Sequence, residues 1–376
     1  MAPHTPHTLG GPPGNPGGPS AAPPTLGGTP GRPSIPLTYR DAGVDIEAGD
    51  ESVRRIAPLA QRTHRAEVLG GIGAFASFVA LPSGLVEPVL VSSTDGVGSK
   101  LKLAFLADRH DTVGIDLVAM GVNDVVVHGA EPLYFLDYIG TARVDPGRIE
   151  AIVRGVAAGC ERAGCALVGG ETAELPDLYA PGEYDLAGFA VGVVERARII
   201  DGTRVAVGDV VLGLASSGLH SNGYSLARRI VFDVLGLAAD GRLPGTRRAV
   251  IDELLEPTRI YVRPVLDVIR RVDVRAMAHV TGGGITGNLP RVLPEGRRAI
   301  VRRSAWEVPA VFSALQEGGR VSDAEMFRTF NMGIGYVMVV PPADADAATR
   351  LLEDRGERVF RLGEIAAGER AVELVA

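Results

Sequence analysis

Apolar and polar positions alternate from Tyr39 onward in a way that predicts strands and helices following one another along the chain. Apolar runs predict strands at residues 75–80, 89–93, 133–139, 166–168, 186–194, 210–215, 277–280, 334–340 and 359–365. Amphipathic patterns predict helices at residues 50–64, with Asp50 as the cap, and at 101–107, 116–127, 146–163, 225–234, 258–272 and 344–353. This order predicts a mixed α/β fold built as two domains of comparable size.

The first 36 residues differ in composition from the rest, because proline and glycine fill roughly half of their positions. We therefore expect a disordered arm over residues 1–36, an N-terminal domain over 37–203 and a C-terminal domain over 204–376. The arm lacks the basic start and apolar run of a signal peptide. No stretch elsewhere is long and apolar enough to span a bilayer, so we expect a cytoplasmic protein without a membrane partner.

Charge and cysteine content narrow the function classes. The 376 residues carry a net charge of -7, and the sequence pI is about 5.6. No basic stripe is present that could neutralise a nucleic-acid backbone, so nucleic acid is not an expected partner. A small anionic substrate needs only local positive charge and fits an acidic protein. The two cysteines, Cys160 and Cys165, support neither a disulfide framework nor a zinc site.

Residues 94–100 read Thr-Asp-Gly-Val-Gly-Ser-Lys and follow the predicted strand 89–93. A strand that stops in Asp-Gly-x-Gly opens a turn whose backbone N–H groups, at Gly96 and Gly98, can face an anion. Asp95 can then hold a divalent metal, and Lys100 can meet phosphate charge. An ordinary Asp-Gly turn with a solvated lysine explains this heptapeptide equally well. Other segments have to decide between the two interpretations.

Three oxygen-bearing side chains share one side of the helix predicted around residues 116–127. Asp116, Asn123 and Asp124 are spaced i, i+7 and i+8, which returns them to one face over two turns. Mg²⁺ suits such a face, since it takes one or two carboxylates and then substrate phosphates. A solvated polar face is the simpler explanation of the helix alone. Beside Asp95, the metal site is the favoured interpretation.

Three further segments place polar groups after predicted strands. A glycine pair at 169–170 precedes Glu171 and lets a ligand approach the backbone, although such a pair also marks plain loops. His220, Ser221 and Asn222 follow the strand 210–215, where α/β folds place ligand sites. His220 is the candidate general base or substrate contact, but a lone histidine is more often structural. Gly282 and Gly283 follow the strand 277–280 and form a backbone nest suited to phosphate.

Seven segments, taken in order, resemble the phosphoribosylformylglycinamidine cyclo-ligase family, also called the aminoimidazole ribonucleotide synthetases. They are residues 39–45, 70–73, 94–100, 110–124, 169–175, 220–225 and 281–284. The resemblance runs from about residue 38 to about residue 370, and the joint occurrence is far more specific than any single glycine loop. Two positions depart from the family pattern: Arg40 stands where lysine is typical and Ser99 where threonine is usual. Both keep the charge or the hydroxyl, but an arginine would not serve as a base.

The resemblance implies an enzyme that uses ATP to close the imidazole ring of a purine precursor. Formylglycinamidine ribonucleotide would become aminoimidazole ribonucleotide, with release of ADP and phosphate. The resemblance also implies a homodimer in which strands of the two N-terminal domains join into a barrel.

The same resemblance assigns roles to the candidate residues. Asp95, Asp124, Glu171 and Asp116 would hold Mg²⁺, and Lys100 and Asn123 would meet ATP. Gly70, Gly71 and Gly73 would form a mobile flap over the nucleotide, and Asp95, Gly96 and Gly98 would also bind ATP. His220, Ser221, Asn222 and Glu171 would contact the substrate, and Gly282 and Gly283 would bind its ribose phosphate. Catalysis would then rest on His220, Lys100 and Asp95 through positioning and electrostatic stabilisation.

Alternatives within the same fold family are separable by sequence. Selenophosphate synthetase typically uses a cysteine or selenocysteine near its start, and a hydrogenase-maturation dehydratase uses a C-terminal cysteine. This chain has neither, and it ends Glu373-Leu374-Val375-Ala376. Thiamine monophosphate kinase needs the same magnesium site without a thiol and is the alternative enzyme, although segments 169–174 and 220–225 are closer to the cyclo-ligase pattern. A nucleotide-binding regulator without catalysis is the alternative from another class, and the complete set of carboxylates argues against it.

Overall fold

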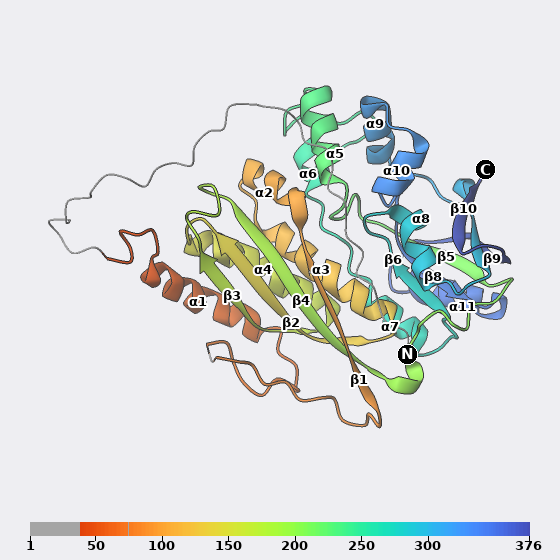
Figure 1. The fold of residues 1–376 in the computed structure, drawn as a ribbon, viewed down its shortest axis with the longest axis horizontal. Helices are drawn as coiled ribbons and strands as arrows, with labels where there is room; N and C mark the ends of the chain where they lie inside the picture. Colours follow the sequence, from red (N-terminus) through yellow and green to blue (C-terminus); the bar gives the residue numbers. More distant parts are fainter. Residues whose placement is uncertain (1–37, 74) are drawn as a thin grey trace, which may run out of the picture. The chain divides into compact units, whose positions relative to one another are not determined.

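The computed structural model describes residues 38–73 and 75–376, so the arm predicted at residues 1–36 lies outside the described residues. Residues Tyr39–Ala376 form one compact unit. Two β-sheets organise this unit, one of four strands and one of six (Figure 1). The boundary predicted at 203/204 falls between the last strand of the first sheet and the first strand of the second.

The first sheet has the strand order β1-β4-β2-β3, with β2 and β3 parallel and the other pairs antiparallel. Helices α3 and α4 lie against one of its faces (Figure 1). Side chains on β2 alternate accordingly, since Phe135, Asp137 and Ile139 are buried toward the helices whereas Tyr134 and Leu136 are only partly covered. The bounds of these elements are α1 Ile46–Gln61, β1 Pro88–Gly96, α2 Leu101–Ala107, α3 Asp111–Val127, β2 Glu131–Thr141, α4 Pro146–Ala163, β3 Ala166–Glu174 and β4 Tyr184–Glu195, with 3-10 turns at Gly98–Lys100 and Arg196–Arg198.

The second sheet has the order β10-β7-β9-β5-β8-β6. Strand β8, which lies between β5 and the edge strand β6, is buried at every position, as expected of a strand covered on both faces. Its elements are β5 Val210–Ala215, α5 Tyr224–Arg228 with a π-helical extension Arg229–Val234, α6 Val250–Leu254, α7 Val262–Ile269, β6 Ala276–His279, α8 Gly284–Asn288, β7 Arg297–Arg302, α9 Ala310–Gly319, α10 Asp323–Thr329, β8 Ile334–Val340, α11 Pro342–Glu353, β9 Val359–Ala367 and β10 Ala371–Val375, with 3-10 turns at Leu289–Val292 and Arg303–Ala305.

Several predicted elements are confirmed at both ends, namely α2, α4, β5 and β8. The strand predicted at residues 75–80 is wrong, because within the described part of that range only Val79 takes part in a bridge, to Val68. The first helix begins at Ile46, so its cap is Asp45 and not Asp50; the Asp45 side chain accepts the N–H of Ala48. The helix predicted at 258–272 is shorter, since it runs only over Val262–Ile269.

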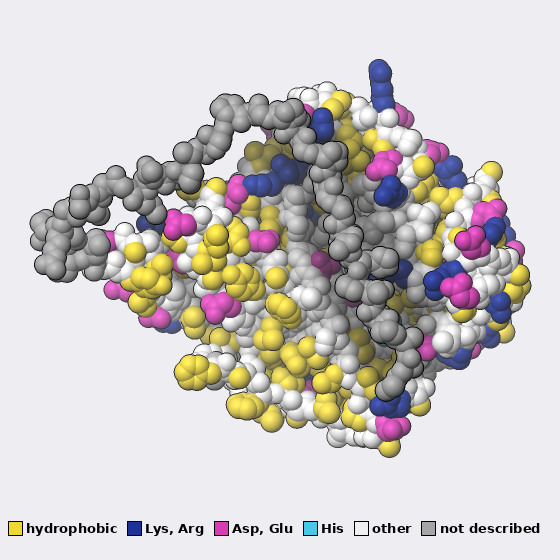
Figure 2. Space-filling model, viewed as in Figure 1, with side chains coloured by type: hydrophobic (Ala, Val, Ile, Leu, Met, Phe, Trp, Pro, Cys, Tyr) yellow, Lys and Arg dark blue, Asp and Glu magenta, His cyan; other side chains and the backbone are white. Residues whose placement is uncertain are grey.

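The far face of the first sheet carries apolar side chains that no helix covers. Leu90 on β1 is 56% exposed and Phe189 on β4 is 43% exposed. Phe75 and Phe78, in the loop before β1, are also exposed. Hydrophobic side chains gather over this part of the molecule in Figure 2. A patch of this kind is typical of an interaction surface.

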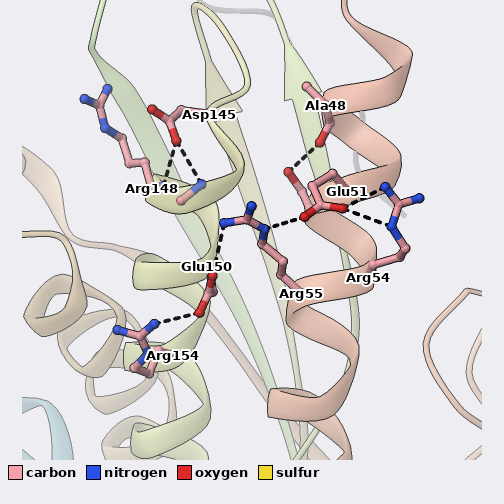
Figure 3. A network of polar contacts seen from close by, with 10 residues as sticks. Ala48, Glu51, Arg54, Arg55, Asp145, Arg148, Glu150 and Arg154 are labelled. Carbon is pink, nitrogen blue, oxygen red and sulfur yellow. Dashed lines mark hydrogen bonds and ion pairs between the residues drawn. The ribbon is translucent and has the colours of Figure 1, made fainter.

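Helices α1 and α4 are joined at the surface by charged side chains. Arg55 of α1 pairs with Glu51 on its own helix and reaches Glu150 of α4, which also pairs with Arg154 (Figure 3). Exposed ion pairs of this kind contribute little free energy each. None of the helices in the described residues is both long enough and apolar enough to cross a membrane.

Candidate active site

Two carboxylates and an imidazole converge where the first sheet meets the second. Asp95 lies near the end of β1, Asp124 on α3, and His279 at the end of β6. The Nδ1 atom of the buried His279 is 2.9 Å from Oδ1 of Asp124. Partial burial and the negative charge of Asp124 raise the pKa of Asp95, although the N–H of Gly96, 2.7 Å from its carboxyl, and the nearby His279 oppose the rise. The carboxylates of Asp95 and Asp124 are therefore close enough to interact electrostatically.

The donor set at Asp95 and Asp124 fits a magnesium ion that is completed by phosphate and water, because Mg²⁺ commonly takes only one or two protein carboxylates. It does not include Asp116 or Glu171, which the family resemblance also assigned to the metal. Within residues 38–73 and 75–376, no group of three or more His, Cys, Asp or Glu side chains is placed to hold a metal.

Asp116 and Lys100 form a buried ion pair, contrary to the expected metal and phosphate roles. Both side chains have no exposed surface, and the Lys100 ammonium lies 2.8 Å from the Asp116 carboxylate. Lys100 also donates to the backbone carbonyls of His220 at 3.0 Å and Glu256 at 2.7 Å. Burial lowers the pKa of Lys100, and the charge of Asp116 opposes this. The sequence-based roles of both residues are not supported, because their charged groups are turned into the protein and already partnered.

The other hydrogen-bond donors to Asp116 come from the second half of the chain. Thr258 donates to Asp116 Oδ1 through its N–H at 2.7 Å and its hydroxyl at 2.6 Å, and Ser221 donates at 3.1 Å. Sequence reasoning missed Thr258, and spacing gives no signal for it, because it lies 142 residues from its partner. Ser221 is correspondingly turned toward Asp116.

Asn123 is also a link between the two halves. Its amide donates to the carbonyl of Arg259 at 2.8 Å, and its carbonyl oxygen accepts the N–H of Tyr261 at 2.9 Å. The side chain is fully buried. The predicted contact of Asn123 with ATP is therefore not supported, since both ends of the amide are occupied by backbone groups.

Glu171 lies on the opposite face of the first sheet from Asp95. Asp95, Gly188 and Asp137 are in register across β1, β4 and β2, and Gly170 continues the row on β3. Neighbours in a row share a face, and the next residue along a strand points to the other face. Glu171, which follows Gly170, is therefore on the uncovered face. The predicted grouping of Glu171 with Asp95 and Asp124 does not occur within one chain.

Asp137, which sequence reasoning missed, is a carboxyl buried on the helix face of this row. Burial raises its pKa to about 7. A Cβ atom at Gly170 would collide with its carboxyl oxygen, so glycine is required at 170 to leave space for Asp137.

The loop containing Gly70, Gly71 and Gly73 lies on the uncovered side. A Cβ at any of the three would meet no atom within 4 Å, so sterics do not demand glycine there, although Gly73 has φ +113°. Gly73 and Glu171 both line a cavity of about 740 Å³ on that face. The loop is therefore near Glu171 and not near the Asp95–Asp124 pair.

The turn after Asp95 differs from the predicted one. Strand β1 continues through Gly96, and a 3-10 turn over Gly98–Lys100 follows. Gly98 has φ +69°, a conformation that favours glycine, and a Cβ at Gly96 would lie 2.9 Å from the carbonyl oxygen of Leu186. Both glycines are explained by the backbone path.

His220 is buried in a left-handed conformation, with φ +62°. Its Nε2 accepts the N–H of Ser217 at 3.2 Å, and its buried Nδ1 has no hydrogen-bond partner among the described residues. Burial, with the positive charges of His279 and Lys100, lowers the pKa of His220 well below its ordinary value. The ring is therefore neutral at physiological pH and keeps one nitrogen unengaged.

The loops 220–222 and 281–284 are neighbours. A Cβ at Gly282 would lie 3.4 Å from Oδ1 of Asn222. The Asn288 amide donates to the carbonyls of Gly282 at 3.2 Å and Gly284 at 2.8 Å, which fixes the glycine loop. Gly283 has φ +98°. His279, which sequence reasoning did not single out, is three residues before Gly282 and connects this loop to Asp124.

Two family models together cover most of the described chain. Residues 83–194 match the AIR synthase related protein, N-terminal domain, and residues 206–375 match the AIR synthase related protein, C-terminal domain. Solved structures with under 25% identity show the same fold. Thiamine-monophosphate kinase from Stenotrophomonas maltophilia K279a has a TM-score of 0.61 and 20% identity, covering 86% of this chain and 95% of that chain; E. coli HypE, a hydrogenase maturation protein, has a TM-score of 0.63 and 17% identity, covering 87% and 94%.

Curated relatives are much more similar in sequence. A protein of Citrifermentans bemidjiense named phosphoribosylformylglycinamidine cyclo-ligase is 55% identical over 343 residues, which cover 90% of this chain and 99% of the relative. A protein of Methylobacillus flagellatus with the same name is 57% identical over 331 residues, covering 88% and 95%. The fold thus defines an AIR synthase-related protein. Within that class, the chain belongs to the phosphoribosylformylglycinamidine cyclo-ligase family.

Proposed function

We propose that the protein uses ATP to close formylglycinamidine ribonucleotide into aminoimidazole ribonucleotide, with release of ADP and phosphate, in purine biosynthesis. Family membership supports this reaction. The observation in the structure that carries the proposal is the convergence of Asp95, Asp124 and His279 at the junction of the two halves. This cluster combines a place for a divalent cation with the loops 220–222 and 281–284, which follow strands where ligands bind in α/β folds.

The chemistry explains why these groups are needed. An amide oxygen is a poor leaving group, so transfer of the terminal phosphoryl group of ATP to the formyl oxygen activates the adjacent carbon. The amidine nitrogen then attacks that carbon, a C–N bond forms, and phosphate leaves with the oxygen. Asp95 and Asp124 would hold Mg²⁺, which neutralises phosphate charge when bound. The protein's own contribution is to position and stabilise charge.

His220 is a proposed substrate contact that acts as a hydrogen-bond donor. Its ring is neutral because burial and nearby positive charges lower its pKa. Because Nε2 accepts the N–H of Ser217, Nδ1 of the neutral ring carries the hydrogen, and this N–H, which has no partner within the described part of the chain, can donate to the substrate. Asn222, Gly282 and Gly283 lie beside it and are the proposed substrate contacts.

We further propose a cytoplasmic homodimer in which the uncovered face of the first sheet packs against a second copy. The exposed Leu90 and Phe189 on that face support this arrangement, since they would be buried on association. Glu171 and the loop Gly70–Gly73 would then lie at the dimer interface. A nucleotide that contacts them there would also contact other residues of the uncovered face. This placement agrees with the cavity that Gly73 and Glu171 share.

The test is an assay of ADP release by the purified protein with Mg²⁺ and ATP, in the presence and absence of formylglycinamidine ribonucleotide, together with aminoimidazole formation. Equal amounts of ADP and aminoimidazole, formed only with substrate, are expected. Asp124→Asn should lose at least about 100-fold in turnover, whereas Asp240→Asn, at an exposed position, should not. ADP formation with thiamine monophosphate instead of the ribonucleotide would assign the kinase activity and overturn the proposal.

A further inference from the structure

A cavity of about 280 Å³ opens beside the Asp124–His279 pair. Strand β1 and helix α3 form one wall, and β6, α8 and the 3-10 turn Leu289–Val292 form the other. Its polar lining includes Ser92, Ser93 and His128 from the first half of the chain. Asp124 and His279 of the candidate active site line it, whereas residues 70–73, 171 and 220–222 do not. Ser92, Ser93, His128 and Arg291 have no role in the reaction proposed above.

Arg291 supplies a positive charge at this cavity that no carboxylate neutralises. Its guanidinium makes one side-chain hydrogen bond, to Oδ1 of Asn288 at 3.3 Å. No Asp or Glu among the described residues forms an ion pair with it, and the side chain is exposed. An arginine held by one neutral acceptor keeps most of its donors for an anion.

The other polar groups of the lining are donors of the kind that phosphate oxygens accept. The hydroxyls of Ser92 and Ser93 make no hydrogen bond to other described residues. Nδ1 of His128 is engaged with the carbonyl of Ile200 at 3.1 Å, which leaves Nε2 unengaged. The side chains of Thr281, Asn288 and Arg291 are linked by hydrogen bonds along the second wall. That wall therefore runs from the vicinity of His279 to the guanidinium.

We propose that this cavity binds the phosphomonoester of the ribonucleotide substrate, with Arg291 as its cationic ligand. The inference rests on the proposed function and makes its substrate site more specific. The lining contains both the Asp124 carboxylate, which would face a cation, and the Arg291 guanidinium, which has no ion-pair partner among the described residues. This combination matches a molecule that carries both a reacting group and a phosphate. Arginine recognises phosphate through two parallel N–H donors.

The proposal changes the assignment made from the sequence, where Gly282 and Gly283 were expected to bind this phosphate. Helix α8 contains only five residues, and the Asn288 amide already holds the carbonyls of this loop. The glycine loop is thus a support for one wall, and Arg291 is the charged group that the phosphate meets.

Steady-state kinetics of Arg291→Met, Arg291→Lys and the control Arg361→Met test the assignment. Arg361 is exposed on β9, and its substitution makes the same change of charge away from the cavity. We expect KM for formylglycinamidine ribonucleotide to rise about 10- to 100-fold in Arg291→Met, with kcat and KM for ATP nearly unchanged. Arg291→Lys should restore part of the loss, and Arg361→Met should match the wild type. A rise in KM for ATP instead would assign the site to a phosphate of ATP, and unchanged constants would remove any phosphate from it.

Calorimetric binding of ribose 5-phosphate, with ribose as reference, separates this inference from the proposed reaction. The wild type should bind ribose 5-phosphate more tightly than ribose, and Arg291→Met should lose that preference even if the enzyme shows no cyclo-ligase turnover. Absence of the preference in the wild type, or its retention in Arg291→Met, would overturn the subsite. Arg291 is exposed and has one hydrogen bond, so thermal unfolding should be unchanged and a loss of binding would not reflect misfolding.

Discussion

Replacing Lys100 by methionine is the sharpest test of how the two halves of the chain are joined. The substitution keeps the length of the side chain and removes the ammonium, which the structure places against Asp116 and two backbone carbonyls. If Lys100 is a structural link, Lys100→Met should reduce the free energy of unfolding and leave Mg²⁺-ATP binding intact. If it is a phosphate ligand, nucleotide affinity should fall first.

The expected magnitude follows from the partners that remain. Removing one member of a buried ion pair costs about 3–5 kcal/mol, because a charge stays buried without its partner. Asp116 keeps three donors, two from Thr258 and one from Ser221, so a loss of about 3 kcal/mol is expected. Adding Asp116→Asn removes the remaining charge, and the double variant should recover about half of that loss.

Urea unfolding followed by circular dichroism and by the fluorescence of Trp306, the single tryptophan and a buried one, measures these differences. Lys102→Met is the matched control, because Lys102 lies on the same segment but its side chain is 44% exposed in a surface pair with Glu183. The control should lose less than about 1 kcal/mol. If Lys100→Met is no less stable than Lys102→Met, or loses more than tenfold in Mg²⁺-ATP affinity while still folded, the reasoning is refuted.

Three further outcomes are expected. Asp137→Asn should flatten the dependence of stability on pH, because the folded protein holds a proton on Asp137 up to about pH 7. The free energy of unfolding of the wild type should therefore fall by about 4 kcal/mol as pH rises from about 4 to 7. Parallel pH profiles of the wild type and the variant in urea unfolding would contradict this. Gly335→Ala should lower turnover at least about tenfold because the added methyl collides with the ring of His220; unchanged kcat with an unchanged crystal position of His220 would refute it. His279→Leu should weaken the binding of Mn²⁺, used in place of Mg²⁺ and followed by electron paramagnetic resonance, by about 10- to 100-fold. The reason is that Asp124 loses its hydrogen-bond partner. Equal affinity of the wild type and the variant would show that His279 does not orient the carboxylate.

The sequence predicted the regular elements well where local chemistry marks their ends. Helix α4 begins at Pro146 and is followed by Gly164 in the left-handed conformation, so both limits could be read from the chain. The run 75–80 failed because only its last residues pair, through the isolated Val68–Val79 bridge, and Phe75 and Phe78 are exposed. Apolar character alone does not separate a strand from a loop on an uncovered face.

The candidate site was predicted only in part, and the reason is the distance of the partners along the chain. Asp95 and Asp124 could be recognised beside a strand and on a helix, and the structure brings them together. Spacing could not reveal that Asp116 is saturated by Thr258, or that Asn123 faces the backbone of the other half. The family resemblance grouped Glu171 with Asp95, and the sequence could not correct this, because alternation on β3 is visible only once the register with β2 is known.

The links made by Asn123 and Lys100 have a consequence for how the protein moves. Each satisfies backbone groups that lie more than 100 residues away, so a hinge between the two halves would leave several buried polar groups without partners. Large domain opening, as in many two-lobed enzymes, is thereby disfavoured, and substrate entry is left to surface loops. We therefore expect that neither half folds on its own. The two halves separated at the connector would be expected to aggregate alone and to regain a soluble form only when expressed together.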